Sequence, residues 1–236
     1  MAKNTVKTRK TVIFIVEGNS DKKALEKIFQ KIYKRKNIVF KFMGGDITSD
    51  EELNKLNVCD AIYQKVDQHM KDKKLKKNDI WQIVHIFDTD GAYIPEDAIE
   101  KGESTEFVYS TSKIFCKNID KVLYRNKRKS EMMNYLLSLD KINGIPYVGY
   151  FMSSNLDHAL YDEQNLDGEL KGEYADEFYT EFQGKELLFI DFLKDEVANG
   201  VPSSFSASWK YIKENVHSLE RHTNLHIYFE TNPYEL

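Results

Sequence analysis

Residues 11–21, TVIFIVEGNSD, constrain the fold of this chain more than any other stretch. The first six are all apolar or β-branched and lack the polar alternation of a strand with one face in water. Glu17 follows them directly, Gly18 permits a tight turn, and the next residues can cap a helix. We therefore predict a central strand, buried on both faces, that ends in a carboxylate and leads into a helix.

A later segment repeats this plan. Residues 80–87, IWQIVHIF, have the composition of a second apolar strand, and Asp88 and Asp90 come directly after it. In open α/β sheets the ligand sites lie beyond the carboxyl ends of the strands. We therefore expect Glu17, Asp88 and Asp90 to converge on one edge of one sheet.

Three carboxylates in one place repel one another, and without a cation at least one of them has to take up a proton. A hard divalent ion removes this conflict. Mg²⁺ prefers oxygen ligands and is typically held by one or two carboxylates together with waters and substrate phosphate oxygens. The three acids therefore indicate Mg²⁺ or Mn²⁺, and phosphoryl transfer becomes the first reaction class to consider.

At this point the sequence resembles a family. Val-Glu-Gly-Asn-Ser-Asp at 16–21 and Asp-Thr-Asp-Gly at 88–91 are similar to the motifs of the TOPRIM domain of topoisomerases, primases, ribosomal RNA maturases and OLD-family nucleases. The resemblance implies a small parallel sheet between helices, with Glu17, Asp88 and Asp90 as the metal and catalytic carboxylates. Asp21 falls where nuclease members often carry a further acidic residue.

A third predicted strand, residues 146–152, is followed by Ser154 and Asp157. OLD-type nucleases have a Ser-x-x-Glu element after a later strand, and this pair has the same spacing with aspartate in place of glutamate. By this resemblance Asp157 and Asp21 would help to hold a second ion. The alternative is an ordinary helix start with Asp157 in its first turn.

The order of strands and helices predicts an α/β fold, a TOPRIM-like parallel sheet flanked by helices. We expect one helix over 20–36 and a second that starts at a capping-box pattern formed by Ser49 and Glu52. Further helices are predicted at 114–123 and at 132–139.

We place the catalytic domain in residues 1–158 and a mainly helical C-terminal elaboration in residues 159–236. Within the second part, residues 162–183 are acidic and contain glycine, which favours a loop or a mobile insertion. Residues 187–197 are expected to form a helix, and residues 225–229 a closing strand.

The chain has 34 basic and 38 acidic residues, a net charge of −4. Residues 20–36 and 117–129 are rich in lysine and arginine, whereas residues 157–196 are acidic. This asymmetry would orient a polyanion over one side of the protein, but ordinary solvated helix faces have the same composition. No apolar run approaches the roughly 18 residues of a membrane span, which favours a cytoplasmic protein without a membrane partner.

The cysteines and four of the histidines carry less specific signals. Cys59 and Cys116 have no metal or redox spacing and are expected as free thiols. His222 and His226 lie four apart in a predicted turn and strand, where exposed polar positions are expected. His85 is expected as a hydrogen-bonded core residue, and His158 is the histidine nearest to the predicted edge, where an acid/base role competes with a structural one.

Taken with the resemblance, these features favour a metal-dependent phosphodiesterase that cleaves nucleic acid. The substrate would be RNA, such as transfer RNA, or DNA. The size and the unmatched tail favour an effector of anti-phage defence that works beside an ATPase partner. The alternatives are a non-catalytic nucleotide-binding or partner-binding module, a small RNA-processing enzyme, and an enzyme that acts on small nucleotides.

Overall fold

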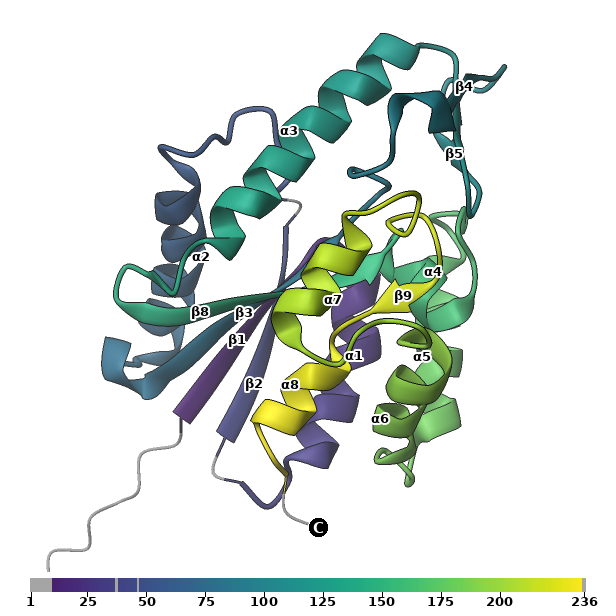
Figure 1. Cartoon of the computed structure of the whole chain (residues 1–236). Coiled ribbons are helices and arrows are strands. Elements are labelled where there is room, and N and C mark those ends of the chain that lie inside the picture. Colours follow the sequence, from purple (N-terminus) through teal and green to yellow (C-terminus); the bar gives the residue numbers. More distant parts are fainter. Residues whose placement is uncertain (1–9, 37, 46, 235–236) are drawn as a thin grey trace, which may run out of the picture.

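The computed structural model describes residues 10–36, 38–45 and 47–234. Its centre is a mixed sheet in which four long parallel strands follow the order β2-β1-β3-β8 (Figure 1). These strands are β1 (Lys10–Val16), β2 (Ile38–Gly44), β3 (Ile80–Asp88) and β8 (Ile145–Ser153). The predicted α/β class is confirmed, and so are the strands predicted at 11–16, 80–87 and 146–152.

Two short antiparallel strands complete the sheet beside β8. β7 (Lys141–Ile142) forms a hairpin with its start, and β9 (His222–Thr223) pairs with its end. The predicted closing strand at 225–229 is wrong, because this segment is helix α8 (His226–Thr231). A short, wholly apolar run fits a buried strand or a buried helix equally well, so its composition could not separate the two.

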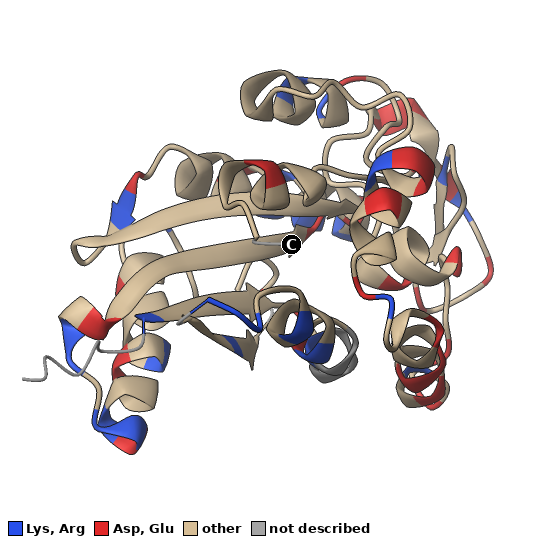
Figure 2. Ribbon diagram, turned by 90° about the horizontal axis from the view of Figure 1, so that it is seen from below, with Lys and Arg blue, Asp and Glu red and all other residues tan. Residues whose placement is uncertain are grey.

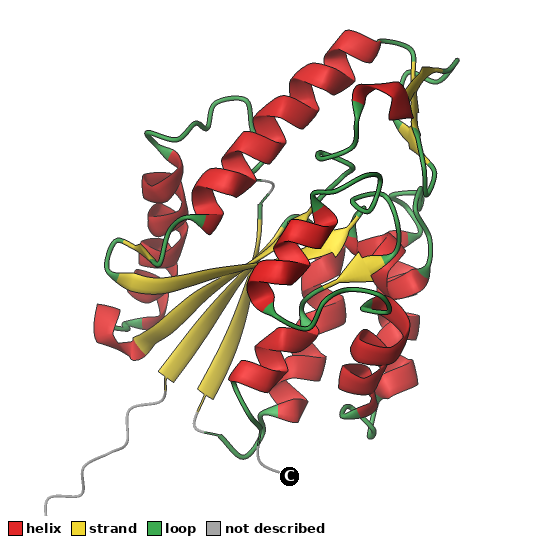
Figure 3. Cartoon of the chain, in the orientation of Figure 1, coloured by secondary structure: helices red, strands yellow, loops and turns green. Residues whose placement is uncertain are grey.

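Helices cover both faces of the sheet (Figure 3). One face is covered by α1 (Asn19–Ile32), α4 (Leu156–Tyr161), α5 (Lys171–Phe182), α6 (Leu188–Phe192) and α8. The other is covered by α2 (Val58–Lys73), α3 (Ile119–Leu137) and α7 (Phe205–Ile212). Alternate residues of β1 serve the two cores, since Phe14 faces the first and Ile13 and Ile15 the second.

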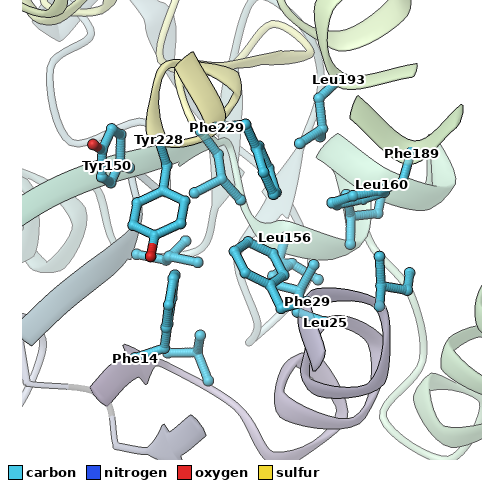
Figure 4. Close-up of a cluster of buried hydrophobic side chains, with 14 of the residues drawn as sticks. Phe14, Leu25, Phe29, Tyr150, Leu156, Leu160, Phe189, Leu193, Tyr228 and Phe229 are labelled. Atoms are coloured by element: carbon cyan, nitrogen blue, oxygen red, sulfur yellow. The ribbon is translucent and has the colours of Figure 1, made fainter. Parts of the chain in front are cut away.

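Aromatic side chains fill the first core, and the C-terminal segment supplies several of them (Figure 4). The ring of Tyr228 lies 5.3 Å from that of Phe14 on β1, and the ring of Phe229 lies 4.9 Å from that of Phe29 on α1. Edge-to-face and tilted ring pairs at such separations add to the free energy gained by burial. The division at residue 158 stays a prediction, but elements from both sides of it share this core.

The segment predicted as an acidic loop, residues 162–183, contains helix α5, so that prediction is wrong for its second half. Ala175, Phe178 and Phe182 recur at helical spacing and are buried against α1 and α6. The four acids of this amphipathic helix are exposed on its outer face: Glu173, Asp176, Glu177 and Glu181.

Two further helix predictions need correction. α2 begins at Val58, and the supposed capping box instead lies in a loop where the Asp50 carboxylate accepts a hydrogen bond from the Glu52 amide at 2.9 Å. The segment predicted as two helices forms strand β6 (Ile114–Cys116) and then the single long helix α3.

β6 belongs to a small second sheet, of order β4-β6-β5, near the first turn of α3 (Figure 1). Its other strands are β4 (Ile99–Lys101) and β5 (Val108–Tyr109). Single helical turns occupy Lys77–Asp79, Glu96–Ala98 and Leu193–Val197, the last of them π-helical.

Charged residues lie mainly on the surrounding helices and loops, and the long strands carry few of them (Figure 2). None of the helices in the described part of the chain has the length and apolar character needed to cross a membrane.

Candidate active site

A buried lysine lies at the carboxyl edge of the sheet. The side chain of Lys129, from the middle of α3, has no exposed surface, and its ammonium donates to both carboxylate oxygens of Glu17 at 3.2 Å. It also donates to Oδ2 of Asp90, and to the hydroxyl of Ser49 at 3.3 Å. Lysines are almost never fully buried unless they are paired, and here two carboxylates supply the pairing.

The sheet brings these two carboxylates together, as the sequence predicted. β1 and β3 are parallel neighbours, so Glu17, one residue past β1, and Asp90, two residues past β3, lie at the same edge. The hydroxyl of Thr48 donates to Oε1 of Glu17 at 2.9 Å and fixes its orientation.

The turn that carries Asp90 has an unusual backbone. Asp90 and Gly91 have φ of 45° and 66°, in the left-handed region that aspartate tolerates and glycine favours. The Asp90 amide donates to the Ser154 carbonyl at 2.5 Å, and the Gly91 amide donates to the Ser218 carbonyl at 3.2 Å. The end of β8 and the C-terminal segment therefore both support the turn.

Two more residues of α3 bind this turn. The guanidinium of Arg125 donates to the Asp90 carbonyl at 2.9 Å and to the Tyr109 hydroxyl at 2.8 Å, and the Asn126 amide donates to the Gly91 carbonyl at 3.1 Å. With Lys129, α3 contacts the turn at three points, which pre-organises the Asp90 carboxylate.

The charges of the site shift its pKa values. Burial alone would raise the pKa of Asp90, but the neighbouring ammonium of Lys129 and guanidinium of Arg125 outweigh it and lower that pKa. His85, inside β3, is held neutral because burial and the charge of Lys129 lower its pKa to about 3. Its Nδ1 lies 2.9 Å from the Tyr147 hydroxyl, so the predicted hydrogen-bonded core histidine is confirmed.

The predicted basic segment 117–129 included Lys129 as a solvated or polyanion-facing residue, and this was wrong. Val122, Lys129, Met133 and Leu136 follow one another at helical spacing, and all of them are buried. Sequence reasoning missed this residue, although a lysine on an otherwise apolar helix stripe was a visible signal for a buried ion pair.

The assignment of Glu17, Asp88 and Asp90 as metal ligands stays a prediction, and the structure brings two of them, Glu17 and Asp90, together on one ammonium. Among the residues whose side chains the structure describes, no three His, Cys, Asp or Glu form a group able to hold a metal ion. Asp88 ends β3 and is half-buried. The Lys129 ammonium balances one of the two charges of Glu17 and Asp90.

The two carboxylates fit one divalent ion. One or two carboxylates suffice for Mg²⁺ when substrate phosphate and water complete its shell. Glu17 and Asp90 would be the protein ligands, and the Lys129 ammonium, which now lies between them, would have to move aside.

The residues predicted for a second ion are placed differently. Asp157 is buried in the first turn of α4, and one of its oxygens lies 2.5 Å from the ammonium of Lys171 on α5. Asn155 caps this helix by accepting from the His158 amide at 2.8 Å, which agrees with the ordinary helix start. The side chain of Asp21 lies outside what the structure describes, so its role stays a prediction.

His158, His222 and His226 are all buried. His158 is a buried residue of α4, and burial lowers its pKa to about 4, so it is neutral at neutral pH. The expectation that His222 and His226 are exposed was wrong: His222 belongs to β9 and contacts the Tyr211 hydroxyl at 3.2 Å, and His226 starts α8. The pairing of β9 with β8 draws this segment into the interior.

No protein-family model, curated protein or solved structure matches this chain. The resemblance to TOPRIM domains therefore rests on the motifs at 16–21 and 88–91 and on their order along the chain.

Proposed function

We propose that this protein is a cytosolic phosphodiesterase that uses Mg²⁺ or Mn²⁺ to cleave nucleic acid. The observation that carries the proposal is the convergence of Glu17 and Asp90, from the ends of two parallel strands, on a single buried cation position. A site that binds one cation between two carboxylates at the ligand-binding edge of an α/β sheet has the donor set of phosphoryl-transfer enzymes.

When bound, the ion would neutralise the scissile phosphate and lower the pKa of the attacking water. Glu17 and Asp90 would hold the ion, and Thr48 and Arg125 keep these two acids oriented. Lys129, on leaving the carboxylates, donates to a phosphate oxygen and stabilises the charge that develops there. Asp88, which ends β3 at the same edge, would be the third carboxylate of the site.

The substrate and setting follow from the TOPRIM resemblance. We place the protein among nuclease effectors of anti-phage defence that act on RNA, such as transfer RNA, or on DNA, beside an ATPase partner. A small RNA-processing enzyme uses the same site and differs in substrate.

One observation favours a second candidate, a module that binds a nucleotide or a partner without turnover. A module that binds no metal would not keep three acids together if nothing balanced their charges. Here, however, Lys129 already neutralises one charge of the Glu17 and Asp90 pair. The two carboxylates are therefore stable in a protein that never binds a metal.

Cleavage separates the two candidates. Wild type and Glu17→Gln are incubated with transfer RNA, single-stranded RNA and supercoiled DNA in Mg²⁺, Mn²⁺ or EDTA, and the products are resolved on gels. Cleavage by wild type alone, abolished by EDTA, supports the nuclease and identifies its polymer. Inhibition of that cleavage by mononucleotides would instead indicate small nucleotides as the substrate. Failure to cleave any polymer under all ions supports the binding module.

A further inference from the structure

A cavity of about 580 Å³ lies between the second sheet and the start of α3. Lys101, Lys117 and Lys121 line it, with Asp120 as a single acid in the lining and with the half-buried ring of Phe107. The lysines are exposed, so their charges face solvent and attract anions.

The cavity is connected to the candidate active site by one face of α3. Lys121, Arg125 and Lys129 are four residues apart, so they lie in one row, each about 6 Å further along the helix axis. Lys121 is exposed, Arg125 is half-buried and Lys129 is buried. The row therefore leads from the surface cavity inward to Glu17 and Asp90.

Contacts along the row show that it is continuous. The Lys121 ammonium lies 5.9 Å from the ring centre of Phe107, and the Arg125 guanidinium lies 5.0 Å from the same ring. Arg125 in turn donates to the carbonyl of Asp90. One side chain thus touches both the aromatic lining of the cavity and the turn that carries a proposed metal ligand.

Cations along a groove together with an aromatic ring are the features that bind single-stranded nucleic acid, because phosphates pair with the cations and a base stacks on the ring. From the cavity, the charged row and their connection we infer that this surface binds the single strand a few nucleotides away from the bond that is cleaved. The inference rests on the proposed function and extends it to where the substrate runs.

Binding without cleavage tests it. Fluorescein-labelled single strands of RNA and of DNA are titrated with the protein in EDTA, and binding is followed by fluorescence anisotropy. Each strand is about ten nucleotides long, within the range that single-strand-binding folds cover. The cavity variants are Lys117→Gln with Lys121→Gln, and Phe107→Leu, which keeps an apolar side chain in its place. The matched control is Lys71→Gln with Lys73→Gln, two exposed lysines in the last turn of α2.

We expect the cavity lysine pair to reduce the salt dependence of binding by about 1.4 in the slope of log K against log salt, since each single-strand phosphate contact contributes about 0.7. Phe107→Leu should weaken binding by roughly 5-fold to 150-fold, the range of one base stacked on an aromatic ring. The α2 control should bind as wild type does, and the RNA and DNA arms show which polymer is preferred.

The inference is overturned if wild type binds neither strand, or if the cavity and control pairs weaken binding equally. It is also overturned if the cavity variants bind as wild type does. In that last case, metal-dependent cleavage by wild type and its loss in Glu17→Gln would leave the proposed function intact, so the two failures are distinguishable.

Discussion

The ammonium of Lys129 lies 3.2 Å from each carboxylate oxygen of Glu17, although the two residues are 112 positions apart in the chain. The contact joins the middle of α3 to the end of β1, and the same ammonium reaches Asp90 after β3. Three elements therefore depend on one buried charge, and the candidate active site is part of what holds the fold together.

Lys129→Met should lower the free energy of unfolding by about 3 to 5 kcal/mol, because it leaves two carboxylates buried without their cation. Urea denaturation in EDTA measures this loss. Lys127→Met, an exposed position on the same helix, is the control and should change stability by less than about 0.5 kcal/mol. Equal urea midpoints for the two variants would show that the buried ion pair does not contribute to stability.

Stability should depend on pH through His85. Its pKa is about 3 in the folded protein and about 6.5 when unfolded, so between these values the unfolded chain binds one more proton. This contribution is present above pH 6.5 and is lost progressively as the pH falls. When the pH falls from 6.5 to about 4.5, the free energy of unfolding of wild type should therefore decrease by about 2 kcal/mol more than that of His85→Gln. Urea denaturation at each pH measures this difference. Parallel pH profiles would contradict the assignment.

Gly91→Ala should destabilise the turn at the site. At Gly91, φ is +66°, and an added Cβ would lie 2.6 Å from a methyl of Leu219 and 3.0 Å from one of Ile114. Gly184, with φ of +82° and open space around it, is the control for the backbone term alone. We expect the free energy of unfolding, measured by thermal unfolding, to fall by about 2 to 4 kcal/mol in Gly91→Ala and by about 1 to 2 kcal/mol in Gly184→Ala. A larger loss at Gly184 would be incompatible with the packing at the turn.

Lys171→Met should lower the free energy of unfolding by about 1 to 3 kcal/mol, since it removes the ion-pair partner of the buried Asp157. Adding Asp157→Asn removes the buried charge and should recover part of that loss. Chemical denaturation of the two single variants and the double variant measures the coupling. Strict additivity would mean that the ion pair between α4 and α5 contributes nothing, and would leave Asp157 free for the predicted second ion.

The sequence predicted the long strands and the meeting of Glu17 with Asp90 because both follow from local composition and from the geometry of parallel neighbours. Lys129 was not found, because its partners come from elements far away in the chain and its charge was counted with exposed neighbours. Only its place on the stripe with Val122 and Met133 marked it as buried.

The C-terminal third was harder to predict because its segments are short and are specified by tertiary contacts. Residues 226–231 form a helix whose Tyr228 packs on Phe14, and that contact is invisible from the segment itself. Phe178 and Phe182 indicated a helix within the acidic segment, but the many acids and glycines outweighed them in the prediction.

Binding of Mn²⁺ tests the central claim most directly, because it asks whether Glu17 and Asp90 form a cation site that Lys129 now occupies. Wild type, Glu17→Gln and Lys129→Met, each shown to be folded by circular dichroism, are titrated with Mn²⁺ by calorimetry. We predict that wild type binds Mn²⁺ with a millimolar or lower dissociation constant. Glu17→Gln should bind at least about tenfold more weakly, which corresponds to about 1.4 kcal/mol of binding free energy. Lys129→Met should bind more tightly than wild type. Absence of millimolar binding to wild type and to Lys129→Met would contradict a metal-dependent enzyme.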